Sequence, residues 1–564
     1  MSNSINQEEE KSDKLLNSEN GSDISENKLI LLYSLTIGFI LLTIIIVFLI
    51  SSHLGNSNEN SSKNNNLVIF LKFKPDIDTE TLLFNQKLLN LISSMKIDEK
   101  KMQNITNVYL FNSTDEHTVE IHIKDYLVDM SQLFKECVKL TEIDLSNLDI
   151  KNVNNISEMF YNCNSLTSIN LNNINTEKII DMSYLFYGCT LLNSLKLNKF
   201  DTSKVENMQY MFSKCNSLTS LDIQNFNTKN LKEMKGMFSG CKNLENLELG
   251  NNFITSNIND ISELFRECYK LSSINLKDID TSRITNMSNL FNGCIGLTSI
   301  DFSKFDTSNV VDMSGLFQLC SSFTSLDLNH LDTSKVEYMS HMFDSCNGLK
   351  ALNIQSFNTS KVKYMNQMFY RCTSMEFFDL QNLDTSEVIN MEGMFDFCSS
   401  LKFLNLSTFD TSKVTDMSYL FAASSKLISV DLSNFNTKNV KTMNHMFYGC
   451  HSLESLDLSS FDVSNLRSMW VMFNECSSIK YLNLSNFNTH NTETMGGAFA
   501  KCNNLTVLDI RNFDSSSLMP NTNLFTDINL NSNGTIYYNS AKFDKSFLNN
   551  YNVKNWVQID VSEL

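Results

Sequence analysis

The sequence is poor in proline, glycine and clustered positive charge. Its 564 residues include only 2 prolines and 16 glycines, a composition unlike that of collagen-like or low-complexity chains. The 14 cysteines are a low fraction, well below that of a disulfide scaffold. The formal net charge of −18 is spread along the chain. Because phosphate binding needs clustered lysine and arginine, the chain is a poor candidate for nucleic acid, and we expect no such partner.

Motifs of catalysis and of metal binding are also missing. The sequence has no CxxC pair, and no phosphate loop, paired-carboxylate pocket or nucleophile motif stands out. The 8 histidines are scattered, and none lies at a fixed distance from the cysteines. We therefore expect no enzyme activity, no cofactor and no metal.

One apolar segment, residues 29–50, differs from the rest of the chain. It has 22 residues without a charge and would span about 33 Å as a helix, enough to cross a membrane. A cleaved signal peptide would have a shorter apolar region. Lys28 adjoins the segment, whereas the first lysine after it is Lys63, so the positive-inside rule predicts a cytoplasmic tail at 1–28 and an extracellular remainder. Residues 51–66 are predicted to be a flexible Asn/Ser linker.

The cysteines recur with a period of 26 residues. Phenylalanine stands three residues before each of them, and apolar residues follow at fixed distances. One step is 27 residues, and we expect a bulge or wider loop near Gly250 to Phe253 to hold the extra one. One step is 52, and there Ser424 stands where the cysteine is expected. The cysteines are at positions 137, 163, 189, 215, 241, 268, 294, 320, 346, 372, 398, 450, 476 and 502.

Each repeat has two periodicities. Leu-Asp-Leu or Leu-Asp-Ile alternates apolar and polar residues and predicts a short strand. Val205, Met208, Phe212 and Cys215 have helical spacing and predict a short helix, with Asp201 suited to its N-terminus. The predicted fold class is α/β, a leucine-rich-repeat solenoid of about fifteen strand and short-helix repeats with a parallel sheet on one face.

The solenoid, residues 129–530, needs covers at both ends because a bare end exposes its core. Residues 67–128 do not repeat and are predicted to be a small α/β cap, with strands at 67–74 and in the two segments VYLF and TVEIHI, and an amphipathic helix at 79–95. Residues 531–564, which include Trp556, are predicted to close the other end.

The repeats resemble the BspA-type leucine-rich repeats of bacterial and protist surface proteins. Segments such as FDTSKVTDMSYLF, MFYGCHSLESLDLSSFD and MFSKCNSLTSLDIQNFNT carry the likeness, which covers about residues 125 to 530. The resemblance implies display on a cell surface, binding to other proteins or cells, and no enzyme activity. The chain departs from many bacterial members in its N-terminal apolar segment, and no wall-sorting motif is visible at its C-terminus.

The cysteines have four possible roles. Neighbouring repeats would bring cysteines within bridging distance, but the gap at Ser424 leaves runs of eleven and three, so pairing of neighbours leaves one thiol over in each run. A metal site lacks the ligand spacing, and a nucleophile lacks a base. The fourth role is packing of a small, buried side chain, which serine can replace. We predict buried free thiols, with a few disulfides as the alternative.

The exposed residues of the predicted strands indicate where a partner would bind. The column seven residues after the cysteines is mostly Asp and Asn, and a solvated sheet face explains it as well as an acidic binding surface does. The column five residues after the cysteines is mostly Ser but has aromatic residues at three positions, and exposed aromatic residues commonly anchor interfaces. Packing of Phe377 and Phe403 under a loop is an equal alternative. The predicted partner-binding residues are Phe377, Asp379, Phe403, Asn405 and Tyr481.

We therefore predict a single-pass membrane protein that presents its repeats outside the cell for adhesion or recognition. The partner would be a protein or glycoprotein on the concave sheet face, and the membrane would be contacted through residues 29–50. The alternative is an inward-facing cytoplasmic scaffold, because fourteen free thiols suit a reducing compartment. A purely structural coat component is a third hypothesis.

Overall fold

The computed structural model describes residues 67–124, 126–277, 279–519, 522–525, 534–548, 553 and 556–562, all within one compact unit that begins at Asn66. The predicted tail, membrane span and linker, at 1–28, 29–50 and 51–66, lie outside the described residues. Among the residues that are described, no helix is long and apolar enough to cross a membrane.

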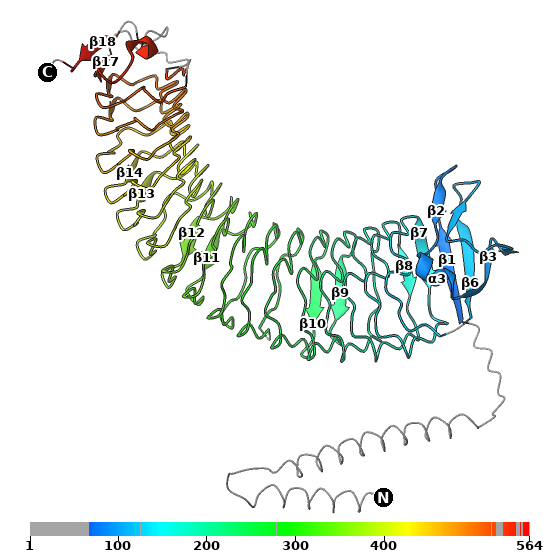
Figure 1. Ribbon diagram of the computed structural model, residues 1–564. Helices are drawn as coiled ribbons and strands as arrows, with labels where there is room; N and C mark the ends of the chain where they lie inside the picture. Colours follow the sequence, from blue (N-terminus) through cyan, green and yellow to red (C-terminus); the bar gives the residue numbers. More distant parts are fainter. Residues whose placement is uncertain are drawn as a thin grey trace, which may run out of the picture. The chain divides into compact units, whose positions relative to one another are not determined.

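A small, mainly β cap precedes the repeats (Figure 1). Its helix is much shorter than the predicted one at 79–95, because residues 92–97 alternate between buried and exposed side chains and pair antiparallel with β6. Strand β1 pairs with β6 on one side and with β7, the first strand of the solenoid, on the other, so the cap covers an edge that would otherwise be open. The elements are β1 (Leu67–Phe73), β2 (Glu80–Leu82), α3 (Gln86–Leu89), β3 (Ile92–Ile97), β4 (Lys100–Lys101), β5 (Val108–Leu110), β6 (His117–Ile123) and β7 (Leu140–Asp144).

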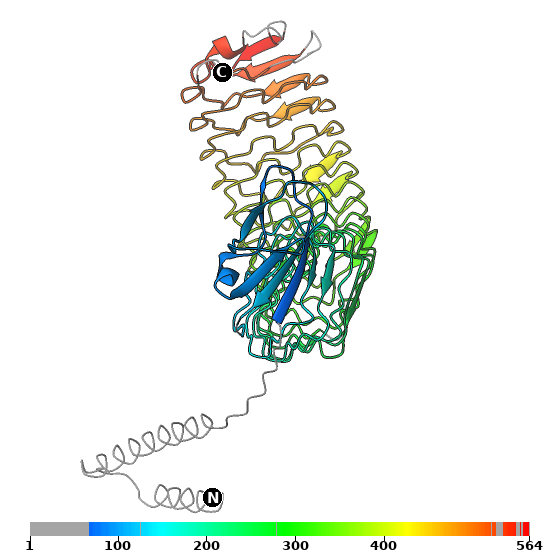
Figure 2. The same cartoon turned by 90° about the vertical axis from the view of Figure 1, so that its right-hand side faces the viewer.

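The predicted solenoid is confirmed: fifteen coils follow one another from the cap to the C-terminal strands (Figures 1 and 2). Each coil contributes a short extended segment that lies parallel to its neighbours, and the pairing joins residues one repeat apart, such as Leu326 with Leu352. The strands are β8 (Ser168–Asn170), β9 (Ser220–Ile223), β10 (Asn246–Leu249), β11 (Ser325–Asp327), β12 (Ala351–Asn353), β13 (Phe403–Asn405), β14 (Ser429–Asp431), β15 (Tyr481–Asn483) and β16 (Val507–Asp509).

The segment that leads to each cysteine is a series of turns and not the predicted helix. Val205, Met208, Phe212 and Cys215 are all buried, as the apolar pattern requires. However, the residues five and one positions before the cysteine column have positive φ in every coil, for example 60° at Lys214, and a right-handed helix excludes such values. The fold class is therefore mostly strand and turn, with little helix.

Backbone hydrogen bonds explain why a turn segment shows a helix-like pattern. The N–H groups of Met208 and Phe212 donate to carbonyl groups of the next coil, Glu233 O at 2.8 Å and Met237 O at 2.9 Å. In a helix these donors would be used inside the same coil. The left-handed residues are four positions apart, so the buried side chains also recur at a spacing of four residues. This spacing is close to the 3.6 residues per turn of a helix.

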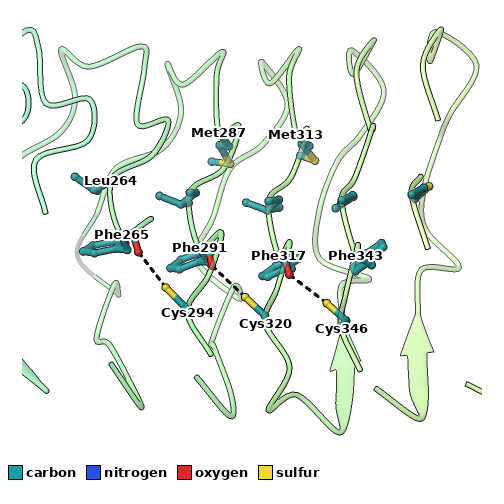
Figure 3. Close-up of a cluster of buried hydrophobic side chains, with 14 of the residues drawn as sticks. Leu264, Phe265, Met287, Phe291, Cys294, Met313, Phe317, Cys320, Phe343 and Cys346 are labelled. Carbon is teal, nitrogen blue, oxygen red and sulfur yellow. Dashed lines mark hydrogen bonds between the residues drawn. The ribbon is translucent and has the colours of Figure 1, made fainter. Parts of the chain in front are cut away.

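Stacked phenylalanines fill the core behind the turn segments (Figure 3). From Phe134 to Phe525, the rings of neighbouring coils lie with centroids 5.4 to 6.0 Å apart and nearly parallel planes. This ladder runs the length of the solenoid, and each aromatic pair contributes about 0.5–1.5 kcal/mol beyond its buried area.

The cysteines form a second ladder beside the phenylalanines. All 14 are free and buried, as the packing hypothesis predicts. Each Sγ after the first coil donates to the phenylalanine carbonyl of the preceding coil, such as Cys320 to Phe291 O at 3.1 Å (Figure 3). Ser424 makes the same contact through Oγ, at 2.8 Å from Phe395 O. The position thus needs a small side chain that can also donate a hydrogen bond, a requirement that size alone did not reveal.

A buried threonine joins neighbouring coils at a third position. Thr333 Oγ1 donates to Asn358 O at 2.9 Å and accepts from Asn358 N at 2.8 Å. Val463 stands at this position in one coil and cannot make these bonds. Asp201, predicted to begin a helix, instead accepts from Ser203 N at 2.8 Å in a local turn.

The extra residue of the 27-residue repeat lies where the sequence predicts it. Phe253 N donates to Gly250 O at 2.9 Å, which closes a turn directly after β10. The backbone of Gly250 passes so near the preceding coil that a Cβ there would lie 1.9 Å from Gln224 O. Glycine is therefore required at this turn because any side chain would collide with the neighbouring backbone.

Two further strands and a short 3₁₀ helix follow the last coil. β17 (Thr535–Tyr538) pairs parallel with β16, and β18 (Val557–Asp560) pairs parallel with β17, so the sheet continues past the repeats. η1 (Lys545–Leu548) lies between these strands in sequence. Trp556 is buried, and its indole lies over Gly534, where a Cβ would be 2.0 Å from the ring.

Candidate functional site

The predicted aromatic residues lie exposed on the strand face, the surface formed by side chains five, seven and nine residues after each cysteine position. Phe377 is 65% exposed and Phe403 is 57% exposed, on neighbouring coils. Phe403 begins β13, where it is in register with Ser429. No loop of the described chain buries either ring, although packing under a loop was an equal expectation for both.

A small cleft lies beside Phe377. It has a volume of about 90 Å³, and both Phe377 and Asp379 line it. The next residue in sequence, Phe378, points inward and lies with its ring centroid 4.7 Å from that of Phe369. This alternation is that of an extended strand, and it explains why only one of the two adjacent phenylalanines reaches the surface.

The structure brings four of the five predicted residues together and leaves the fifth apart. Phe377, Asp379, Phe403 and Asn405 occupy neighbouring coils, which the ion pair between Lys402 and Glu376 (2.8 Å) also joins. We call these four residues the phenylalanine patch. Tyr481 is 54% exposed in β15, three coils further along, or about 14 Å away.

The acidic column of the strand face has a structural role that the sequence did not reveal. Asp301 accepts from Ser303 N at 2.9 Å, and Asp457 accepts from Ser459 N at 2.9 Å. Asn405 makes the same contact with Ser407 N at 3.0 Å. These bonds close the turn after each extended segment. Hydrogen bonds from the Ser303 side chain and backbone lower the pKa of Asp301, and those from the Ser459 backbone and side chain lower the pKa of Asp457. Turn formation therefore explains why Asp and Asn predominate in this column.

A second surface carries more varied side chains than the strand face. We call it the turn face: the residues five, two and one positions before each cysteine position. In the early coils four tyrosines gather there. The rings of Tyr161 and Tyr187 stack at 4.7 Å, and those of Tyr184 and Tyr210 stack at 5.2 Å. Lys214 Nζ lies 4.9 Å from the centroid of Tyr187, a cation–π contact.

This tyrosine cluster borders a cleft of about 460 Å³. Glu263 and Arg266 stand on the opposite side, with Arg266 Nη1 3.4 Å from Glu263 Oε2. Lys235 Nζ also lies 3.4 Å from Glu263. Burial raises the pKa of Tyr210, and the nearby Glu263 carboxylate raises it further. The sequence contained a signal for this cluster, since tyrosine recurs at the same two positions of successive repeats.

Later coils place buried polar groups on the turn face. Asp396 is 7% exposed, and no hydrogen-bond partner for its Oδ1 is found in the part of the chain that is described. Burial raises the pKa of Asp396 to about 7. His445 stacks on Tyr419 at 4.5 Å, and burial lowers the pKa of its imidazole. The described residues contain no group of three or more His, Cys, Asp or Glu side chains that could hold a metal ion.

Comparison with known families identifies the repeats. Overlapping matches to the family described as "Mycoplasma protein of unknown function, DUF285" cover most of the chain. The chain belongs to this family. The matches cover residues 81–171, 166–274, 259–376, 364–481, 428–536 and 451–561. No curated protein matches the sequence.

Two solved structures share a weak likeness with this member of the family. One is the functional domain of InlJ from Listeria monocytogenes, whose description mentions a cysteine ladder; it is 17% identical, with a TM-score of 0.22, over 71% of this chain and 74% of that one. The other is TLR13 in a complex with a single-stranded RNA, 14% identical with a TM-score of 0.14, over 74% of this chain and 92% of that one.

Proposed function

We propose that this protein is a non-enzymatic surface protein, anchored by residues 29–50, whose solenoid binds proteins or glycoproteins outside the cell. The uncharged apolar run of 22 residues supports the anchor, and Lys28 beside it supports a cytoplasmic N-terminus. The resemblance of the repeats to BspA-type leucine-rich repeats supports surface display. A stack of coils also supports binding, since it offers a long continuous surface with many contact positions.

The observation that carries the binding proposal is the pair of exposed rings in the phenylalanine patch. Phe377 and Phe403, 65% and 57% exposed, occupy the same column of neighbouring coils. Most residues of that column are serine, so the two rings form a local apolar site on a polar face. Aromatic residues with a polar surround are typical of the centre of a protein interface.

The alternative is an inward-facing scaffold that uses the same patch. Its support is the set of 14 free thiols, which a reducing compartment would keep reduced. All of these thiols are buried, however, and burial raises the pKa of Cys320 and its neighbours, which slows oxidation. Free thiols of this kind are compatible with an oxidising exterior, so we favour surface display.

Adhesion of cells that carry the full-length chain tests the proposal. Such cells would be incubated with intact animal cells, untreated or trypsin-treated, and the bound fraction counted. We expect Phe377→Ala with Phe403→Ala to lower adhesion by about tenfold or more, because each buried aromatic anchor contributes about 2 kcal/mol or more. Trypsin treatment should lower wild-type adhesion as well.

The matched control replaces two exposed phenylalanines outside the patch. Phe70 in β1 is 45% exposed and Phe397 on the turn face is 40% exposed. Phe70→Ala with Phe397→Ala should leave adhesion unchanged. Equal adhesion by the patch variant and the wild type would remove the phenylalanine patch from the proposed function.

A further inference from the structure

The tyrosine-bordered cleft of the turn face exists because one coil lacks large side chains there. In the coil of Cys241 the three turn-face residues are Gly236, Ser239 and Gly240, and no other coil has glycine or serine at all three positions. Both glycines have positive φ, 58° and 74°. The two neighbouring coils keep long side chains, which form a wall on either side of this coil. The side chain of Tyr210 covers Gly236 and hydrogen-bonds to Glu263, so the open part of the cleft lies over Ser239 and Gly240.

The two walls differ in chemistry. On one side stand the tyrosine rings and Lys214, and the ring of Tyr210 leans over Gly236, where a Cβ would lie 2.2 Å from its Cε1. On the other side stand Glu263, Arg266 and Glu267. The contacts of Arg266 with these carboxylates are long, 3.4 and 3.6 Å, so its guanidinium is not held by close hydrogen bonds.

The lining excludes several classes of ligand. It consists of three tyrosines, two serines, one glycine, one lysine, one arginine and two glutamates, with no aliphatic side chain. A lipid or an aliphatic peptide side chain would find no aliphatic side chain to pack against. The two positive and two negative charges balance, so the lining favours neither a polyanion nor a polycation.

We infer that this cleft binds a neutral saccharide. The apolar C–H groups of a sugar ring suit the parts of the tyrosine rings that line the cleft, and its hydroxyl groups both donate and accept hydrogen bonds. The glutamates accept, Lys214 and Arg266 donate, and Ser213 and Ser239 do both. The volume of about 460 Å³ lies in the usual range for a small-molecule site. This inference does not rest on the proposed function, because the cleft and the phenylalanine patch lie on different faces.

A glycan array tests the inference with three sets of immobilised probes. These are neutral oligosaccharides, sialylated or sulfated oligosaccharides, and glucosamine oligomers with free amines. The labelled full-length chain should bind members of the neutral set. Failure to bind any neutral probe, or binding confined to the charged sets, would overturn the inference.

Substitutions then locate the site. Tyr210→Ala should weaken binding of the best neutral probe by about fivefold, because it removes an aromatic contact of about 1 kcal/mol. Ser239→Tyr should abolish binding by filling the cleft, and tyrosine already stands at that position in four other coils, so the fold tolerates it.

The control is Tyr419→Ala, since Tyr419 occupies the same turn-face position as Tyr210 and has a similar φ, 58° against 52°. It should lose the same stability and keep saccharide binding. Loss of binding in Tyr419→Ala equal to that in Tyr210→Ala, or unchanged binding in Ser239→Tyr, would contradict the assignment of the cleft.

Discussion

Substitution of Ser424 tests the requirement for a small hydrogen-bond donor in the cysteine ladder. Ser424 Oγ lies 2.8 Å from Phe395 O, and this carbonyl otherwise accepts only a long bond from Cys398 N at 3.4 Å among its described contacts. Ser424→Ala keeps the size of the side chain and removes the donor. We expect a local loss of about 1 kcal/mol, the net contribution of a buried hydrogen bond.

Ser424→Cys should be nearly neutral, because thirteen other coils make the contact with sulfur, as Cys450 does to Phe421 O at 3.2 Å. Ser424→Val should lower the local stability by about 1–3 kcal/mol more than Ser424→Ala does, because valine is too large for this closely packed position.

Hydrogen exchange is the suitable assay because a long repeat array does not unfold in one cooperative step. A loss of 1 kcal/mol corresponds to about fivefold faster exchange of amides that open locally. The amides of Ala423 and Ser424, which are hydrogen-bonded to Tyr448 O and Phe421 O, would report it. Unchanged exchange in Ser424→Ala together with faster exchange in Ser424→Cys would refute the donor requirement and leave size as the sole constraint.

Three other properties follow from buried polar groups. The 14 thiols should resist a maleimide in the native chain and react only in denaturant; rapid labelling of most of them would contradict their burial. The pKa of Asp396 is about 7 in the folded chain, above its value of about 3.9 in the unfolded chain. The free energy of unfolding should therefore fall as pH rises from about 4 to about 7, by at most about 4 kcal/mol. Asp396→Asn should remove this pH dependence, which denaturation at pH 5 and pH 8 would measure. Thr333→Val should destabilise its coil by about 1–3 kcal/mol because it leaves Asn358 N unbonded, whereas Val463→Thr should stabilise its coil. Hydrogen-exchange rates equal to those of the wild type in both variants would contradict the role of this ladder.

Periodicity revealed the solenoid but not the conformation of its turns. A strict repeat of 26 residues with buried columns requires a stack of similar units, whatever their local geometry. Spacing of three and four residues fits a helix, and it equally fits a four-residue turn unit in which Tyr210 and Lys214 are left-handed. The chain adopts a helix if its backbone N–H groups bond within the coil, and turns if they bond to the next coil. The pattern of a single sequence does not reveal this choice.

The candidate sites were also predictable from the sequence only in part. Strand alternation placed Phe377 and Phe403 on the outward face, but only the structure decided that the rings are exposed and not packed under a loop. The role of the Asp and Asn column in turn formation was hidden, since Asp301 looks the same in sequence whether it faces a ligand or its own backbone. The cleft over Ser239 and Gly240 was also hidden, because it arises where a coil with small turn-face side chains lies between two coils with large ones.

Labelling of a single introduced thiol on intact cells tests the proposed display most directly. The native cysteines are buried, so Phe403→Cys would place one reactive thiol on the strand face of the full-length chain. A membrane-impermeant maleimide should label this variant on intact cells and leave the wild type unlabelled. Labelling of the variant only after the membrane is permeabilised would place the solenoid inside the cell and contradict the proposed surface role.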